Sequence, residues 1–235
     1  MRKFLKRMTG IFLCVAMAAG VYGAIPAYAE GTDTGTDIQA QAAQWPTGPA
    51  VQAASAIIMD ASTGTVLYEK DADTPRYPAS ITKIMTTLLA LENCNLDEMV
   101  HFSATAVYEN EGGTSHIARD LDEEMTLEQC LYGIMLESAN ECSYAVAEHV
   151  GGGDYQKFID MMNAKAAELG CTNTHFNNCN GLPDPAHVVS ARDMALISRE
   201  AIKNSMFRKI VGTVRYEIPP TNKHADPTPL NTTIR

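Results

Sequence analysis

Apolar residues recur at helical spacing directly after Pro78. The pattern has the period of a helix with one face turned toward a protein core, and its members are Ile81, Ile84, Met85, Leu88 and Leu89. Ser80 stands at the start of this predicted helix, and Lys83 and Thr87 share with it the face opposite the apolar stripe. Because residues three apart on a helix are neighbours, the pattern already places a hydroxyl beside an amine.

Four further helices and several strands are predicted. The helices run from Thr126, which opens a T-x-x-Q capping box, to about Leu136, then over 141–150 and 154–169, and from Ser190 to about Lys203. Strands are expected at 54–60 and 65–70, joined by a turn at 61–64, and at 214–218, with an extended piece at 174–176 and a turn at 180–181. Residues 100–125 show no clear period, and 112–115 indicate a loop.

Helices thus lie between N-terminal and C-terminal strands. This order predicts an α/β fold of the α+β kind, with helices packed on an antiparallel sheet and a helical subdomain beside it. A cleft between two such parts is a usual place for a functional site.

The first 29 residues have the pattern of a signal peptide. Four basic residues precede an apolar run at 11–21, and Ala27-Tyr28-Ala29 is a small-x-small cleavage site. The run is too short for a membrane span, which needs about 20 residues. We therefore expect an exported protein cleaved after Ala29, with a polar linker at 30–52 and a folded domain at 53–235.

Charge and cysteine content narrow the class further. The net charge of −10 becomes −14 once the four leader bases are removed, which argues against nucleic acid as a partner. Five cysteines remain, an odd number that does not fit a complete disulfide framework. Cys171 and Cys179 could bridge a loop, whereas Cys130 and Cys142 fall in apolar helical patterns. No C-x-x-C pair or Cys/His cluster indicates a metal, so no metal or cofactor is predicted.

Two short motifs carry the candidate chemistry. In Ser80-x-x-Lys83 a hydroxyl nucleophile lies next to a potential base, although a helix-capping serine and a solvated lysine would give the same letters. Ser138-Ala139-Asn140 occupies a break between two predicted helices, where both polar side chains can point into a cleft. Asn140 could instead cap the second of those helices.

Together these motifs resemble the active-site serine penicillin-recognising enzymes, for which S-x-x-K and S-x-N are signatures. More closely, the chain resembles the low-molecular-mass D-alanyl-D-alanine carboxypeptidases of the peptidase S11 type. The resemblance covers 53 to about 232 and rests on the stretches 59–68, 78–86, 136–141, 158–163, 168–170, 174–176, 180–182 and 190–195.

The resemblance implies the fold of penicillin-recognising serine transferases and β-lactamases, and a reaction through an acyl-enzyme. Ser80 would attack the bond between two D-alanines of a peptidoglycan stem peptide, and Lys83 would be its base. Ser138 would relay a proton toward the leaving amine, and Asn140 would hydrogen-bond Lys83 or the substrate amide. β-Lactams would be covalent inhibitors, and no cofactor would be needed.

Two departures from the family pattern stand out. Ala139 replaces the usual glycine of S-G-N, which would strain a turn that needs positive φ. No K-T-G triplet follows Asn231-Thr232, and the C-terminal β-rich domain and the amphipathic membrane-attaching helix of the family do not follow either. On this ground 53–235 is expected to be a partial DD-peptidase catalytic domain with unknown substrate-binding residues. One lost oxyanion-hole donor costs about 10²–10³ in rate, so a weak or inactive product is expected.

Alternative functions stay open at this point. A class A β-lactamase shares the Ser-x-x-Lys helix but needs an E-x-x-L-N loop, which is absent. A silent wall-binding or regulatory protein and a D,D-endopeptidase are also compatible. Among other polar residues, His187 is expected near the mouth of the cleft. Arg192 and Asp193 should brace their helix, and the acidic run 120–124 is interpreted as a solvated loop.

Overall fold

The structure is a computed structural model and describes residues 48, 50–109 and 113–232. The predicted signal peptide (1–29) lies outside the described residues, as does most of the predicted linker (30–52). The architecture below is that of the unit Thr47–Arg235, which contains all the described residues.

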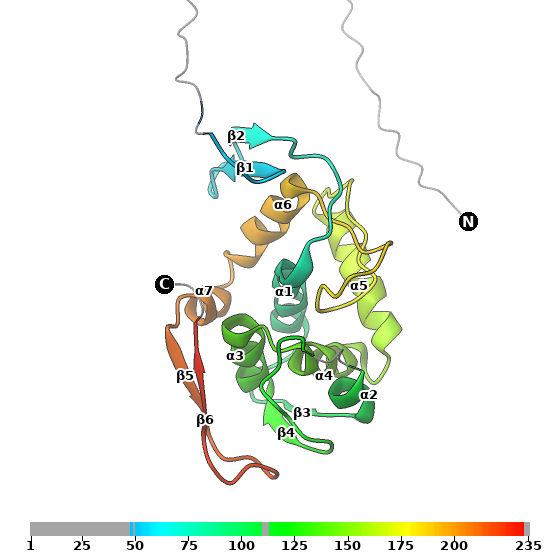
Figure 1. The fold of residues 1–235 in the computed structure, drawn as a ribbon, viewed down its shortest axis with the longest axis vertical. Coiled ribbons are helices and arrows are strands. Elements are labelled where there is room, and N and C mark those ends of the chain that lie inside the picture. The colour runs from blue at the N-terminus through cyan, green and yellow to red at the C-terminus, as the bar shows by residue number, and fades with distance from the viewer. Residues whose placement is uncertain (1–47, 49, 110–112, 233–235) are drawn as a thin grey trace, which may run out of the picture. The chain divides into compact units, whose positions relative to one another are not determined.

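One helix, α1 (Lys83–Asn93), lies at the centre of the unit and contacts α3, α4, α5, α6 and α7 (Figure 1). It continues a short 3-10 turn, η1 (Ala79–Thr82). The remaining helices are α2 (Ala104–Tyr108), α3 (Leu127–Glu137), α4 (Asn140–Gly151), α5 (Tyr155–Glu168), α6 (Ala191–Ala201) and α7 (Ser205–Val211). Because α1 is central, most of its side chains from Lys83 to Ala90 are buried by neighbouring helices.

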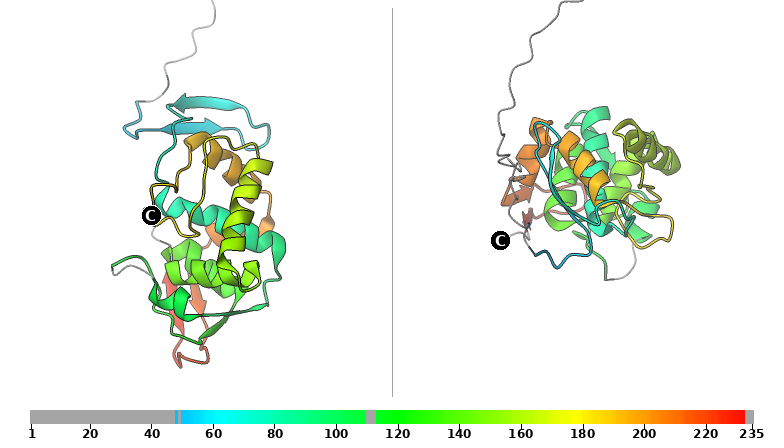
Figure 2. Two further views of the ribbon diagram at one scale, coloured as in Figure 1. Left: turned by 90° about the vertical axis from the view of Figure 1, so that its right-hand side faces the viewer. Right: turned by 90° about the horizontal axis from the view of Figure 1, so that it is seen from above.

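The strands form three separate antiparallel pairs among the described residues. They are β1 (Ala56–Met59) with β2 (Val66–Lys70), β3 (Met99–His101) with β4 (Glu124–Thr126), and β5 (Arg215–Ile218) with β6 (Thr228–Asn231). The β1–β2 hairpin lies next to α6, and the other two pairs lie beside α3 (Figures 1 and 2). The predicted α/β class with antiparallel strands is confirmed, but the one sheet expected from the sequence is represented in this region by small pairs.

The core consists of two clusters of buried side chains that meet at α1. One cluster joins α3 and α4 to β3–β6 and includes Ala90, while the other joins α1 to α5 and α6 through Met85, Leu88 and Leu89. The prediction that the apolar residues of this helix face the core is wrong for the first of them, Ile81, which lies in η1 and is 49% exposed. On the opposite face, which was predicted to be polar, Lys83 and Thr87 are also buried, because several helices pack around α1.

Helix starts follow the capping signals in the sequence. Thr126 and Gln129 form both bonds of a capping box at α3, and Ser190 Oγ accepts from Asp193 N at the start of α6. The short elements α2, α7, β3, β4 and β6 were not predicted. Each of the three strands has only three or four residues, too few to show a period, and depends on its pairing partner for definition.

The acidic run 120–124 is exposed to solvent at Asp120, Asp122 and Glu124, as predicted, but not at Glu123. Glu123 is fully buried and accepts from Arg119 Nη1 at 2.9 Å, from Asp120 N at 2.9 Å and from Thr221 Oγ1 at 2.7 Å. Buried carboxylates are retained where hydrogen bonds and a cation satisfy them. This network joins the loop before β4 to the connection between β5 and β6.

The remaining predictions about this unit concern thiols and membranes. Cys171 and Cys179 are free thiols, as are Cys94, Cys130 and Cys142, so the possible 171–179 bridge is not formed. Within 48, 50–109 and 113–232, every helix is too short or too polar to cross a bilayer.

Candidate functional site

Ser80 lies at an unusual backbone turn at the start of the central helix. Ala79 has φ +52°, in the left-handed region that L-residues seldom adopt. Pro78 precedes it, and η1 passes directly into α1 at Lys83. Ser80 is exposed, and its Oγ lies 3.2 Å from Lys83 Nζ and 2.9 Å from Ser138 Oγ. Neither helix start uses a side-chain cap, so the interpretation of Ser80 as a simple capping residue is wrong.

Lys83 is buried, with 2% of its surface exposed, and its ammonium group has three acceptors. Nζ donates to Asn140 Oδ1 at 2.7 Å, to the Asn180 carbonyl at 2.7 Å and to Ser80 Oγ at 3.2 Å. Burial lowers the pKa of Lys83 from 10.5 to about 8, since desolvation disfavours the charged form. The alternative of a solvated lysine is therefore wrong.

The two amide oxygens fix where the lone pair of a neutral Lys83 points. Asn140 Oδ1 and the Asn180 carbonyl can only accept, so they take the two N–H bonds of the neutral amine. The remaining direction faces Ser80 Oγ, whose hydroxyl can donate. The geometry thus suits transfer of the Ser80 proton to Lys83.

Ser138 approaches from the break between α3 and α4. It has φ +58° at the C-cap of α3, and its Oγ donates to Ser80 Oγ. Ala139 has φ −59° and ψ 116°, a conformation open to any L-residue. The strain expected from alanine at position 139 is therefore absent, because the left-handed residue of this turn is Ser138.

Asn140 is the first residue of α4 and is 4% exposed. Its backbone N–H donates to Ser115 O at 3.0 Å, and its side-chain oxygen accepts from Lys83. Ala139 is the N-cap of α4 and makes no side-chain cap bond. Asn140 therefore does not cap this helix, and its amide is directed at Lys83.

A loop after α5 completes the surroundings of Ser80 and was not assigned to the site from the sequence. Asn180 supplies the carbonyl that binds Lys83, and Gly181 packs against the peptide between Ala79 and Ser80. A Cβ on Gly181 would lie 1.9 Å from Ala79 O, and its φ is +89°. The sequence marks the Asn-Gly pair as a turn and as part of the family resemblance, but its contact with Ser80 depends on the tertiary structure.

We expect Gly181→Ala to damage the site more than the fold. The clash must push the 180–181 loop away from Ala79 and weaken the Asn180–Lys83 bond, and the positive φ adds about 1 kcal/mol or more of strain. Acylation by penicillin should fall at least about tenfold, since small displacements of positioning groups are costly. Gly170→Ala is the matched control, because it also has positive φ but open space at Cβ. Equal rates in the two variants would contradict the positioning role of Gly181.

His187 supports this turn from inside the protein and is not at a cleft mouth, as the sequence had suggested. It is 1% exposed, and its Nδ1 accepts from Asn177 N at 3.0 Å. Nε2 therefore carries the proton and donates to Thr82 Oγ1 at 2.8 Å. Burial lowers the pKa of His187 to about 4, so the ring is neutral at physiological pH.

Arg192 and Asp193 brace α6, as predicted. Arg192 bonds Asp73 and Glu69, and Asp193 accepts from Asn173 N and Thr174 Oγ1. Arg192 therefore ties α6 to β2 and the segment after it, Asp193 ties α6 to the loop after α5, and none of these hydrogen bonds involves Ser80.

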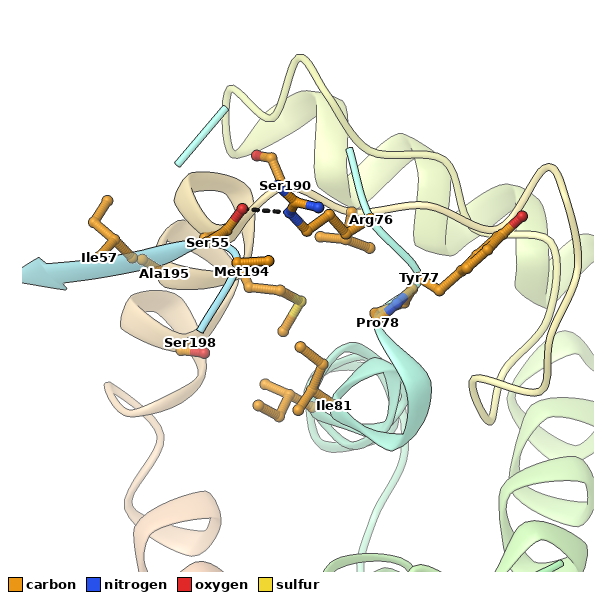
Figure 3. Close-up of a pocket in the computed structure, with 14 residues that line it drawn as sticks. Ser55, Ile57, Arg76, Tyr77, Pro78, Ile81, Ser190, Met194, Ala195 and Ser198 are labelled. Carbon is orange, nitrogen blue, oxygen red and sulfur yellow. Dashed lines mark hydrogen bonds between the residues drawn. The ribbon is translucent and has the colours of Figure 1, made fainter. Parts of the chain in front are cut away.

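An apolar groove of ≈ 530 Å³, whose lining residues are drawn in Figure 3, includes Tyr77, Pro78 and Ile81 from the segment around Ser80. Ile57, Ile81 and Met194 line it, and Arg76 hydrogen-bonds Ser55 at one side. Tyr77, Pro78 and Ile81 flank Ser80 in sequence, but none of the four predicted site residues lines the groove. The hydrogen-bonded constellation, and not this groove, therefore defines the candidate site.

The chain belongs to the D-alanyl-D-alanine carboxypeptidase family, peptidase S11, which it matches over residues 39–225. The resemblance seen in the sequence motifs is thereby confirmed.

Two curated relatives and two solved structures place the chain within that family. It is 39% identical over 164 residues to the D-alanyl-D-alanine carboxypeptidase DacF of Bacillus subtilis, covering 69% of this chain and 42% of the relative. It is 36% identical over 210 residues to the D-alanyl-D-alanine carboxypeptidase of Streptomyces sp. K15, and this match covers 85% of this chain and 66% of the relative. The chain therefore spans less than half of the first relative and about two thirds of the second.

The fold likeness is equally clear. The crystal structure of the Streptomyces K15 DD-transpeptidase superimposes with a TM-score of 0.72 at 34% identity, covering 80% of this chain and 76% of that one. The crystal structure of the D-alanyl-D-alanine carboxypeptidase DacD of Francisella tularensis superimposes with a TM-score of 0.69 at 33% identity. This match covers 74% of this chain and 43% of that one. The expected fold of penicillin-recognising enzymes is thus confirmed for the described part of the chain.

Proposed function

We propose that this chain carries the acylating centre of a serine-type D-alanyl-D-alanine carboxypeptidase. The single observation that supports it best is the position of Ser80 Oγ, between Lys83 Nζ at 3.2 Å and Ser138 Oγ at 2.9 Å. Lys83 is buried with a lowered pKa, as a base near neutral pH requires. Membership of the family and the names of its relatives point to the same reaction.

The proposed reaction uses only side chains of this constellation. Neutral Lys83 accepts the Ser80 proton as Ser80 Oγ bonds to the carbonyl carbon of the penultimate D-alanine. The proton then moves from Lys83 through the Ser138 hydroxyl to the amine of the terminal D-alanine, and the C–N bond breaks. Water afterwards gives a proton to Lys83 and attacks the ester, and Lys83 returns this proton to Ser80 Oγ as the acyl C–O bond breaks. Asn140 holds Lys83 in place through its side-chain oxygen.

The substrate and location follow from the same proposal. The acyl donor would be a peptidoglycan stem peptide ending in D-Ala-D-Ala, met outside the cytoplasm after export and removal of residues 1–29. β-Lactams would acylate Ser80 in place of the peptide. A net charge of −10 supports the view that nucleic acid is not a partner.

Trapping by a fluorescent penicillin tests the proposed function. We expect one covalent adduct per chain that hydrolyses slowly, and release of the terminal alanine from a tripeptide ending in D-Ala-D-Ala but not from one ending in D-Ala-L-Ala. A folded protein that forms no adduct would overturn the proposal. Rapid catalytic turnover of penicillin would indicate a β-lactamase instead.

A further inference from the structure

Three side chains with different metal-binding atoms converge at the end of α1 that is distant from Ser80. They are Cys94, Glu98 and His149, and their ligand atoms all lie within 4.8 Å of one another. Cys94 directly follows α1, Glu98 precedes β3, and His149 is in the last turn of α4. Among the described residues, no other cluster of three potential ligands is as tight.

The cluster joins the same two helices that form the candidate active site. α1 and α4 contact each other, and they begin at Lys83 and Asn140, which share a hydrogen bond. Their other ends meet at Cys94 and His149. The negative ends of both helix dipoles therefore lie near the cluster, which favours a cation there.

The arrangement fits zinc better than a harder cation. Thiolate sulfur, imidazole nitrogen and carboxylate oxygen are the ligands that zinc prefers, whereas magnesium and calcium take oxygen. A Cys thiolate and a Glu carboxylate would together neutralise the charge of one divalent ion. In tetrahedral geometry, metal–ligand bonds of about 2.0–2.3 Å place the ligand atoms roughly 3.3–3.8 Å apart. The three ligand atoms here lie within 4.8 Å of one another, so small side-chain movements would bring them to the distances that zinc requires.

Neighbouring groups already orient the ligands. Glu98 Oε1 accepts from Asn95 N at 2.6 Å and from Asn95 Nδ2 at 3.0 Å, which leaves Oε2 directed at His149 Nε2, 2.8 Å away. The Glu98 carbonyl accepts from Leu127 N, and Cys94 N donates to Ala90 O. Such outer bonds fix ligand orientation in metal sites.

Solvent can reach the cluster. All three side chains are partly exposed, and His149 lines a surface hollow of ≈ 460 Å³. A hydrated ion can therefore enter, and a water molecule can remain as its fourth ligand, as in three-ligand zinc sites.

We propose that Cys94, Glu98 and His149 form a zinc-binding site that clamps the C-terminal ends of α1 and α4 together. On binding, the thiol proton passes to solvent and His149 adopts the tautomer protonated at Nδ1, so that zinc on Nε2 replaces the hydrogen bond between Glu98 and His149. This differs from the sequence expectation of no metal, because Glu98 and His149 are 51 residues apart and meet only through tertiary packing.

Metal titrations of the purified protein test the site without any measurement of peptidase activity. Added Co²⁺, a spectroscopic substitute for zinc, should give a near-ultraviolet thiolate-to-metal absorption band at one ion per chain. Zn²⁺ should displace it and raise the melting temperature, whereas Mg²⁺ should do neither. Absence of the thiolate band in the folded wild-type protein would overturn the proposal.

Matched variants separate this site from adventitious binding to other thiols. Cys94→Ser, His149→Ala and the isosteric Glu98→Gln should each weaken Zn²⁺ binding at least about tenfold. Cys171→Ser and His101→Ala are the controls, since both side chains lie outside the cluster, and they should bind as the wild type does. Zinc affinity that is the same in the two sets would contradict the assignment. If penicillin fails to acylate the protein while the metal-binding results are as expected, the proposed peptidase function is contradicted and the zinc site is not.

Discussion

Replacing Ser80 by alanine is expected to abolish covalent labelling by penicillin. Loss of a serine nucleophile in a catalytic unit costs about 10⁶ in rate, because no other hydroxyl is hydrogen-bonded to Lys83 among the described residues. The side chain is exposed, so we expect the melting temperature to change by only a few degrees. Gel fluorescence after prolonged incubation, together with thermal unfolding, measures both effects.

The matched control for this substitution is Ser205→Ala. Ser205 is an exposed serine at the start of α7, outside the constellation. It should label at the wild-type rate. Labelling that persists in Ser80→Ala would show that another residue is the nucleophile.

Replacing Lys83 by methionine is expected to slow acylation by about 10²–10⁴, the usual contribution of a positioned base. Methionine fills similar volume, but Asn140 Oδ1 and the Asn180 carbonyl lose their donor, at about 1–3 kcal/mol for each unsatisfied group. A loss of unfolding free energy should therefore accompany the kinetic loss. Penicillin labelling rates and chemical denaturation measure the two effects.

Two further variants distinguish the role of Lys83 as a proton acceptor from the effect of its positive charge. Lys83→Arg keeps a cation but not a proton acceptor, since arginine stays protonated, so it should acylate as slowly as Lys83→Met. Lys165→Met removes an α5 lysine that pairs with Glu92 on α1 and with Glu168 on α5, and it should leave the labelling rate unchanged. A Lys83→Arg variant with wild-type rates would show that Lys83 acts by charge alone.

Helices that start with strong local signals could be predicted from the sequence. The Thr126 capping box and the Ser190 cap mark α3 and α6 correctly. The predicted C-terminal end of α6, about Lys203, lies too far along the chain. The helix ends at Ala201, and Asn204 then caps the start of α7. Asn204 is itself a capping residue, but the segment it opens is only seven residues long and shows little periodicity.

The environment of α1 could not be read from its pattern. A stripe of apolar residues predicts one buried face, and the structure buries Thr86, Thr87 and Lys83 as well. Those polar residues are buried because other helices surround α1, which is a property of the whole fold. Burial is also what lowers the pKa of Lys83, so the electrostatics of the candidate site depend on tertiary packing.

The sequence motifs named four residues that the structure brings together, but not the groups that hold them. The pairing of Lys83 with Asn140 links positions 57 apart, and that with Asn180 links positions 97 apart. The second partner is a backbone carbonyl, which has no sequence signature of its own. Gly181 and His187 act on the turn around Ser80 in the same way, through contacts that depend on the fold.

The pH dependence of Ser80 acylation tests the central claim most directly, namely that a buried Lys83 is the base. A protonated Lys83 cannot accept the Ser80 proton, so the rate should rise with pH through an apparent pKa of about 8 and level off above it. At pH 7 about one tenth of the lysines would already be neutral, far more than for an ordinary lysine. A rate that does not change between about pH 6 and 10, or that rises only near the pKa of a solvated lysine, would contradict the claim.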